Sequence, residues 1–201
     1  MEKYIFGLIA QFIIAIAIVP YIVSIFRGTV KPNRISWFIW SIVGFTFWVV
    51  TPANADEITK MLTLVFMLSP TTVFFVTLFK GDNKQPDVLE IFALLTGLSA
   101  ISLWYITKES AGITPTIIAI IADLSALLPT LRFVYKSPQE ETPFAWIAFF
   151  VGSSIALLAI DNYTLQNLLL PSYMALGSFF VVYPLVSYRL KMKTELKAWI
   201  I

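Results

Sequence analysis

The chain contains neither cysteine nor histidine. Without cysteine it can form no disulfide framework and no thiolate metal site. Without histidine it has no imidazole ligand, no histidine acid–base group and no Ser-His-Asp triad. We therefore expect no enzymatic activity, no metal and no cofactor. A membrane-embedded enzyme that works with carboxylates alone is the least favoured alternative, because no acidic pair lies within one apolar segment.

Charged residues are also scarce. They make up 13% of the 201 residues, whereas 58% are hydrophobic and the mean hydropathy is +0.82. A soluble domain of this size would need more charge to cover its surface. The composition predicts an all-α membrane protein, since a helix satisfies its own backbone polar groups in lipid. The expected partners are the lipid bilayer and a small-molecule solute, not a nucleic acid.

Seven apolar segments are long enough to cross a hydrocarbon layer of about 30 Å as helices, two of them marginally at about 17 residues. They cover residues 4–26, 35–51, 58–79, 88–107, 113–135, 143–160 and 165–188. The first segment lacks a cationic start and a small-residue cleavage site. We therefore expect it to be a retained span and not a signal peptide.

Basic residues are distributed unequally between the expected loops. Eleven of the 14 Lys and Arg residues follow the first, third, fifth and seventh segments, and only Lys3, Lys60 and Lys108 lie on the other side. This bias predicts that the N-terminus is outside and the C-terminus is cytoplasmic, which requires an odd number of spans. With no targeting extension evident, we expect a multi-pass protein of the bacterial inner (plasma) membrane.

The sequence also contains an internal duplication. Pro20 is followed seven residues later by Arg27, and Pro129 is followed at the same spacing by Lys136. A polar loop and a tryptophan-containing apolar run come after each pair. Further matches are Trp40 with Trp146, Asp56 with Asp161, and Pro70 with Pro171.

The duplication pairs the first three segments with the last three and leaves the fourth unpaired. It predicts two parallel three-helix repeats joined by a linker helix, a 3+1+3 plan. The expected divisions are a first bundle at 1–80, a linker with the fourth helix at 81–110, and a second bundle with a basic cytoplasmic tail at 111–201.

These features resemble the SWEET/PQ-loop (MtN3-like) transporter superfamily over residues 4–188. Its members share the late proline of each repeat, the basic loop, the polar-aromatic start of the next helix and the 3+1+3 plan. Here Tyr21 and Thr130 follow the two prolines in place of the glutamine that names the PQ loop, so the chain looks closer to small bacterial members. The resemblance implies alternating-access transport of a small polar solute, either sugar-like or vitamin- or nucleoside-like.

Asp123 lies at the centre of the fifth segment. An unpaired carboxylate there costs at least about 2.5–3.5 kcal/mol. Two interpretations remain open. Asp123 either binds substrate or a coupling proton, or it is a neutral acid that donates a hydrogen bond between helices. The first repeat has Ile14 at the matching position.

Other polar and aromatic groups lie near the expected mid-membrane level. By resemblance, the third and seventh helices contribute polar groups to a central solute site; hydrogen bonding between helices is the alternative. Tryptophans of both repeats could stack on a planar solute or anchor the helices at the interface. The candidates are Thr71, Thr72, Asn167, Ser172, Tyr173, Trp40 and Trp146.

Four prolines recur at matching positions of the repeats: Pro20, Pro129, Pro70 and Pro171. A proline removes a backbone hydrogen bond and crowds the preceding turn, so each could serve as a hinge. The alternative is that prolines are simply common in membrane helices.

The loop acids offer one further hypothesis. Glu140 and Glu141 could pair with nearby basic residues as a cytoplasmic gate, although those residues also suit topology and lipid-headgroup contact. The rival to a transporter is a non-transporting receptor or assembly factor on the same scaffold, with all polar groups paired between helices. A homo-oligomer is compatible with either function.

Overall fold

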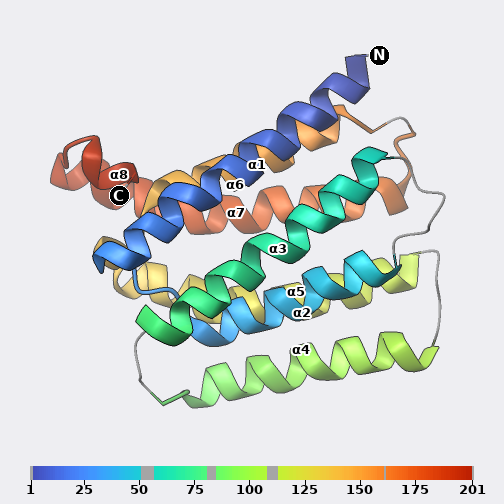
Figure 1. The fold of residues 1–201 in the computed structure, drawn as a ribbon, viewed down its shortest axis with the longest axis horizontal. Coiled ribbons are helices and arrows are strands. Elements are labelled where there is room, and N and C mark those ends of the chain that lie inside the picture. Colours follow the sequence, from blue (N-terminus) through green and yellow to red (C-terminus); the bar gives the residue numbers. More distant parts are fainter. Residues whose placement is uncertain (1, 51–56, 81–84, 108–112, 161, 201) are drawn as a thin grey trace. The chain divides into compact units, whose positions relative to one another are not determined.

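A computed structural model describes residues 2–50, 57–80, 85–107, 113–160 and 162–200. Within these ranges the chain is helical and contains no strand, which confirms the all-α prediction (Figure 1). The expected match between Asp56 and Asp161 lies outside these ranges, as do parts of the linker. The helices are α1 (Glu2–Arg27), α2 (Arg34–Val50), α3 (Glu57–Lys80), α4 (Val88–Thr107), α5 (Ile113–Lys136), α6 (Pro143–Leu158), α7 (Leu165–Met192) and α8 (Lys197–Ile200), with a 3-10 turn, η1 (Pro138–Glu140).

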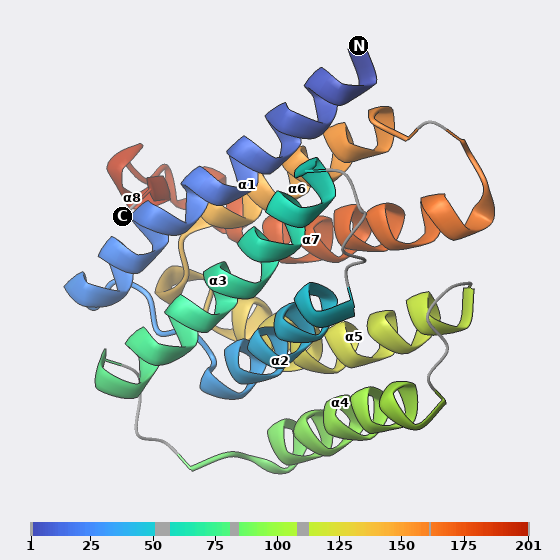
Figure 2. The same ribbon diagram turned by 45° about the vertical axis from the view of Figure 1, so that its right-hand side comes forward.

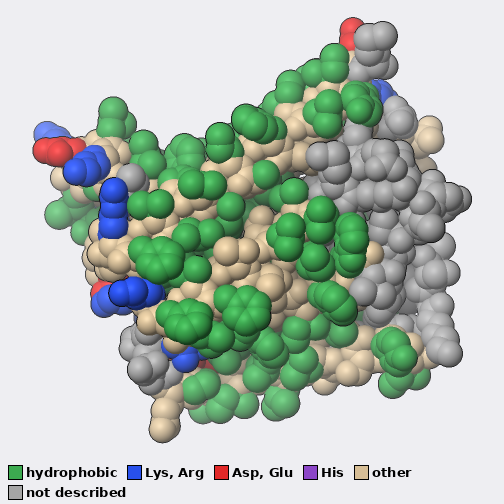
Figure 3. Space-filling view, in the orientation of Figure 1, with side chains coloured by type: hydrophobic (Ala, Val, Ile, Leu, Met, Phe, Trp, Pro, Cys, Tyr) green, Lys and Arg blue, Asp and Glu red, His purple; other side chains and the backbone are tan. Residues whose placement is uncertain are grey.

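Two helical stretches among the described residues, Glu2–Arg27 and Leu168–Met192, are long and apolar enough to cross a membrane. Shorter apolar helices occur at Leu64–Lys80, Val88–Leu103 and Pro143–Leu158. Hydrophobic side chains cover much of the face shown in Figure 3. This surface suits contact with lipid, while seven spans and their orientation stay predictions.

The chain divides into two compact units. Unit 1 contains residues 1–32 and 130–201, and unit 2 contains residues 33–129. In unit 1, α6 packs against both α1 and α7, as Figures 1 and 2 show from two directions. In unit 2, α2 packs against α3 and α4. These units are defined by packing, whereas the predicted bundles follow sequence order and remain an interpretation of the duplication.

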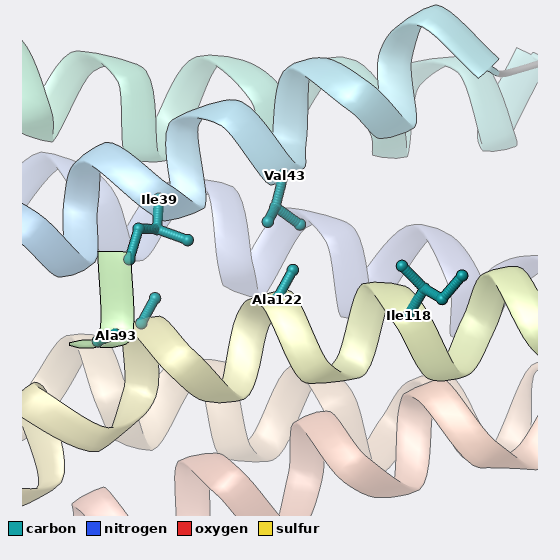
Figure 4. Packing of buried hydrophobic residues seen from close by; sticks show 6 residues of the cluster. Ile39, Val43, Ala93, Ile118 and Ala122 are labelled. Atoms are coloured by element: carbon teal, nitrogen blue, oxygen red, sulfur yellow. The ribbon is translucent and has the colours of Figure 1, made fainter. Parts of the chain in front are cut away.

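The apolar core of unit 2 joins α2, α4 and α5. Ile39 and Val43 of α2 lie on one side of the cluster (Figure 4). Ala122 and Ile118 of α5 face them. Ala126 of α5 and Ala93 of α4 complete the group. The spacing of four residues puts each helix's contributions on one face. Small alanine side chains allow the helices to approach closely.

Two glycines mark the tightest helix contacts. A Cβ at Gly44 of α2 would overlap the Phe66 carbonyl oxygen of α3 and lie 2.8 Å from its carbonyl carbon. A Cβ at Gly152 of α6 would lie 2.6 Å from Ile14 Cγ1 of α1. Close backbone approach at small residues is typical of helices that pack in membranes.

The ends of α1 are held by polar contacts within unit 1. Near its start, Lys3 Nζ donates to the Ile160 carbonyl at 2.8 Å. At its end, Gly28 adopts φ +74° and donates its N–H to the Ile25 carbonyl at 3.0 Å. A glycine in this left-handed conformation stops a helix without the strain that a Cβ would bring.

The four predicted hinge prolines all lie inside helices. Pro20 is in α1, Pro70 in α3, Pro129 in α5 and Pro171 in α7. Pro129 is also the last residue of unit 2, so the division between the units runs through α5 at this proline.

Candidate functional site

The residues predicted for a central solute site are distributed over both units. Unit 1 contains Trp146, Ser172 and Tyr173, and unit 2 contains Trp40, Thr71, Thr72 and Asp123. The side chain of Asn167 lies outside the described residues. Convergence of these groups on one solute therefore stays a prediction.

Their local surroundings differ. Thr71 donates its hydroxyl to the Met67 carbonyl at 2.6 Å, and Thr72 donates to the Leu68 carbonyl at 2.7 Å. Both bonds run back along α3 itself, which leaves only the hydroxyl lone pairs to accept from a ligand. Asp123 is half-buried on α5.

The two tryptophans and the α7 pair also have distinct environments. Trp40 packs edge-to-face on Trp37, with ring centroids 5.1 Å apart, a favourable aromatic geometry. Trp146 is buried in unit 1, and Ser172 and Tyr173 are half-buried on α7. Trp146 belongs to a different and more highly organised group of polar residues.

That group surrounds Glu141, in the connection between η1 and α6. Its side chain is only 2% exposed. The Tyr21 hydroxyl of α1 donates to Glu141 Oε2 at 3.0 Å, and the Thr142 backbone N–H donates to Oε1 at 3.0 Å. Both carboxyl oxygens therefore accept hydrogen bonds from neutral donors. We call Tyr21, Glu141, Thr142, Trp146 and Arg189 the Glu141 cluster.

Arg189 of α7 is the buried cation of this cluster. Its Nη2 donates to the Glu141 carbonyl oxygen at 2.7 Å, its Nη1 to the Pro138 carbonyl at 2.6 Å, and its Nε to the Ala198 carbonyl at 3.4 Å. The rigid fork of a guanidinium is well suited to bridging several acceptors. Arg189 thus ties η1, the start of α6 and α8 to α7.

The pKa of Glu141 is raised from 4.5 to about 8, chiefly because burial penalises the charged carboxylate. Hydrogen bonds from the Thr142 amide, the Tyr21 hydroxyl and the Trp146 indole lower the pKa in part, and the Arg189 charge lowers it further. Burial outweighs these effects, so the carboxyl group holds its proton at neutral pH.

The adjacent acid has a different environment. Glu140 Oε1 lies 3.8 Å from Lys31 Nζ, with both side chains substantially exposed. The Lys31 N–H also donates to the Glu140 carbonyl at 3.3 Å. Sequence reasoning considered both acids as gate residues but missed Tyr21 and Arg189 as the partners of Glu141. The one available signal was a tyrosine directly after Pro20.

No family model matches the chain, and neither a curated protein nor a solved structure matches it.

Proposed function

We propose that the chain is an integral membrane transporter that carries a small polar solute by alternating access. The observation that carries this proposal is the division of the chain at Pro129, where unit 2 ends in the interior of α5. A proline inside a helix removes a hydrogen bond and permits bending there. The chain passes between the two units at Pro129 and once more between Pro32 and Asn33, and compact units joined by two such connections can change their arrangement without unfolding.

The repeated order of the elements supports the same function. Helices α1, α2 and α3 have 26, 17 and 24 residues, and α5, α6 and α7 have 24, 16 and 28. With α4 as the linker, this is the order expected of a 3+1+3 transporter. Seven spans with an external N-terminus and a cytoplasmic C-terminus belong to the proposal.

The proposed solute is sugar-like or vitamin- or nucleoside-like, and its site is formed at mid-membrane. Asp123 and Tyr173 are its most informative residues, because one is acidic and the other combines a ring with a hydroxyl. Both would lose a specific polar group on conservative substitution. Trp40 and Trp146 would supply stacking surfaces.

A stability screen tests binding. Detergent-purified protein is heated with sugars, nucleosides, amino acids and vitamins at about pH 5.5 and 7.5. A solute present at about 100 times its Kd stabilises by about 2.7 kcal/mol. The shift should disappear in Asp123→Asn and Tyr173→Phe and persist in Tyr183→Phe, a matched control at an exposed position of α7. A shift retained in both site variants would refute this site.

Transport itself is tested with the solute so identified, in proteoliposomes. Pro129→Ala should restore a backbone hydrogen bond, slow uptake several-fold and leave the thermal shift intact. The control is Pro184→Ala, which changes a proline of α7 that is not one of the four matched prolines. Equal uptake by wild type and Pro129→Ala would contradict the hinge.

One observation favours the alternative, a receptor or assembly factor that transports nothing. The half-buried Thr71 hydroxyl already bonds within α3, as expected if the middle of the protein is dry, whereas Thr72 is exposed. Under this alternative, no solute in the screen shifts the thermal stability and no uptake occurs.

A further inference from the structure

The Glu141 cluster connects elements that are distant in sequence. Tyr21 comes from α1 and lies 120 positions before Glu141. Arg189 comes from α7 and reaches η1, Glu141 and α8 through three carbonyl oxygens. Ser24 of α1 adds a contact to α8, with its Oγ 3.4 Å from the Ile200 carbonyl. All of these contacts lie within unit 1.

Ionisable groups face Glu141 from α1 and from α7. From α1 the facing group is Tyr21, and from α7 it is Arg189, which directs its nitrogens to carbonyl oxygens and not to the carboxyl oxygens. Within the connection, Glu140 pairs outward with Lys31. Lys136 at the end of α5 and Lys197 of α8 are exposed. The donors that reach the carboxyl oxygens are thus neutral.

We propose that Glu141 is a proton-binding site whose occupancy controls the attachment of α1 and α8 to this end of unit 1. With the proton bound, the carboxyl and the Tyr21 hydroxyl face each other as two neutral groups. Arg189 then keeps its hydrogen bonds to the carbonyl oxygens, because a neutral carboxyl does not attract its charge.

Loss of the proton to solvent changes this balance. A negative charge in a dry site must be hydrated or paired. Hydration requires α1 to move away at Tyr21, and pairing requires Arg189 to turn from its carbonyls to the carboxylate. When Arg189 turns, its hydrogen bonds to the Pro138 and Ala198 carbonyls break. The bond to Ala198 is its contact with α8. Ionisation therefore loosens α1, α8 or both.

The sign of the pH effect follows from the shifted pKa. The pKa of Glu141 is about 8 in the folded protein, above its ordinary value of 4.5. Its contribution to stability is therefore fully present below about pH 4.5 and is lost as the pH rises through about 8. The site also occurs only once, since Ile35 is the residue of the first repeat that matches Glu141.

Thermal unfolding of detergent-purified protein between about pH 4.5 and 9 provides the first test. The Tm of the wild type should fall by several degrees across this range. Glu141→Gln, which mimics the protonated acid, should show little of this fall, whereas the control Glu140→Gln should keep it. An equal fall in Glu141→Gln and wild type would overturn the proposal.

A second variant separates a proton site from a purely structural contact. The Tyr21 hydroxyl lowers the pKa of Glu141, so Tyr21→Phe should move the midpoint of the pH-dependent fall to a higher pH. A lower Tm with an unchanged midpoint would contradict the proposal.

The movement can be observed directly, because the chain has no cysteine to interfere with labelling. Spin labels at Arg27→Cys and Glu195→Cys, both exposed positions of unit 1, report the distance between the end of α1 and the segment before α8. The distribution should be narrow at about pH 5.5 and broad at about pH 9. With Glu141→Gln added it should stay narrow. These measurements need no solute, so their result is independent of the proposed transport.

Discussion

The start of α2 in unit 2 and the start of α6 in unit 1 occupy matching places in the duplication, yet they use different chemistry. In unit 2, Asn33 Oδ1 accepts the Ser36 N–H at 2.9 Å and the Asn33 amide donates to Glu90 of α4. In unit 1, Thr142 precedes α6 without a side-chain cap, and the carboxyl beside it is buried. One unit caps its helix near the surface; the other buries an ionisable group.

The arginines of the two sites differ in the same way. Arg34 is half-buried and donates through Nη2 to the Thr77 carbonyl at 3.1 Å. Arg189 is 4% exposed and donates to three carbonyls. A repeated apolar pattern thus leaves the polar connections free to diverge: the buried acid Glu141 of unit 1 matches the apolar Ile35 of unit 2.

The largest expected effect separates these arginines. Arg189→Met leaves buried carbonyl oxygens without donors, each costing about 1–3 kcal/mol, so we expect a loss of about 3–4 kcal/mol in total. Arg34→Met should cost less, about 1 kcal/mol, since Arg34 is half-buried and its bond to the Thr77 carbonyl is only partly shielded from water. Thermal unfolding of both variants measures the difference. Equal losses would show that the two sites are equivalent after all.

The next effect concerns the glycine contacts. Gly44→Ala places a Cβ against the backbone of α3, which cannot move aside, and should cost about 2–3 kcal/mol. Gly152→Ala meets the buried Ile14 side chain at 2.6 Å and the Ala10 carbonyl oxygen at 3.1 Å, a milder overlap that should cost about 1–2 kcal/mol. Chemical denaturation in mild detergent compares the two variants. A larger loss at Gly152 would contradict the assignment of the tighter contact to α2 and α3.

A smaller effect tests the caps. Asn33→Ala removes the cap of α2 and should cost about 1 kcal/mol. The comparison change Thr142→Val removes a buried hydroxyl that caps nothing while keeping the shape of the side chain, and should cost less than about 0.5 kcal/mol. The comparison uses Tm values at one pH. A large loss from Thr142→Val would reveal a role for the hydroxyl that the geometry does not indicate.

The smallest effect is expected at Lys31. Its ion pair with Glu140 is 3.8 Å long and exposed, so Lys31→Gln should change the free energy of unfolding by less than about 0.5 kcal/mol. Raising the salt concentration should remove even this difference. A loss above about 1 kcal/mol would mean that the Lys31 side chain does more than pair at the surface.

The helical fold could be predicted because its signals are local. Runs of apolar residues, broken by polar loops such as that from Gly28 to Arg34, placed the helix ends close to where they lie. The pairing of α1 with α6 could not be predicted, because the same apolar side chains suit any neighbouring helix. In the structure, Gly152 packed against Ile14 is one of the contacts that set this pairing.

The candidate site was predictable only in part, for a similar reason. The mid-segment position of Asp123 is visible in the sequence, but its partners are not. Glu141 looked like half of an exposed acidic pair, and nothing local distinguishes it from Glu140. Its burial arises from Tyr21 and Arg189, which come from other parts of the chain.

The membership of α1 in unit 1 has a consequence for the order of events during synthesis. Unit 2 is one continuous stretch, residues 33–129, and can complete its contacts as it emerges. Helix α1 cannot place Ile14 against Gly152 until α6 has been made. Such nonlocal contacts form late and slow folding. In ribosome-bound chains that end before α6, disulfide cross-linking of cysteines introduced in α2 and α3 should therefore already succeed while α1 has no α6 to pack against.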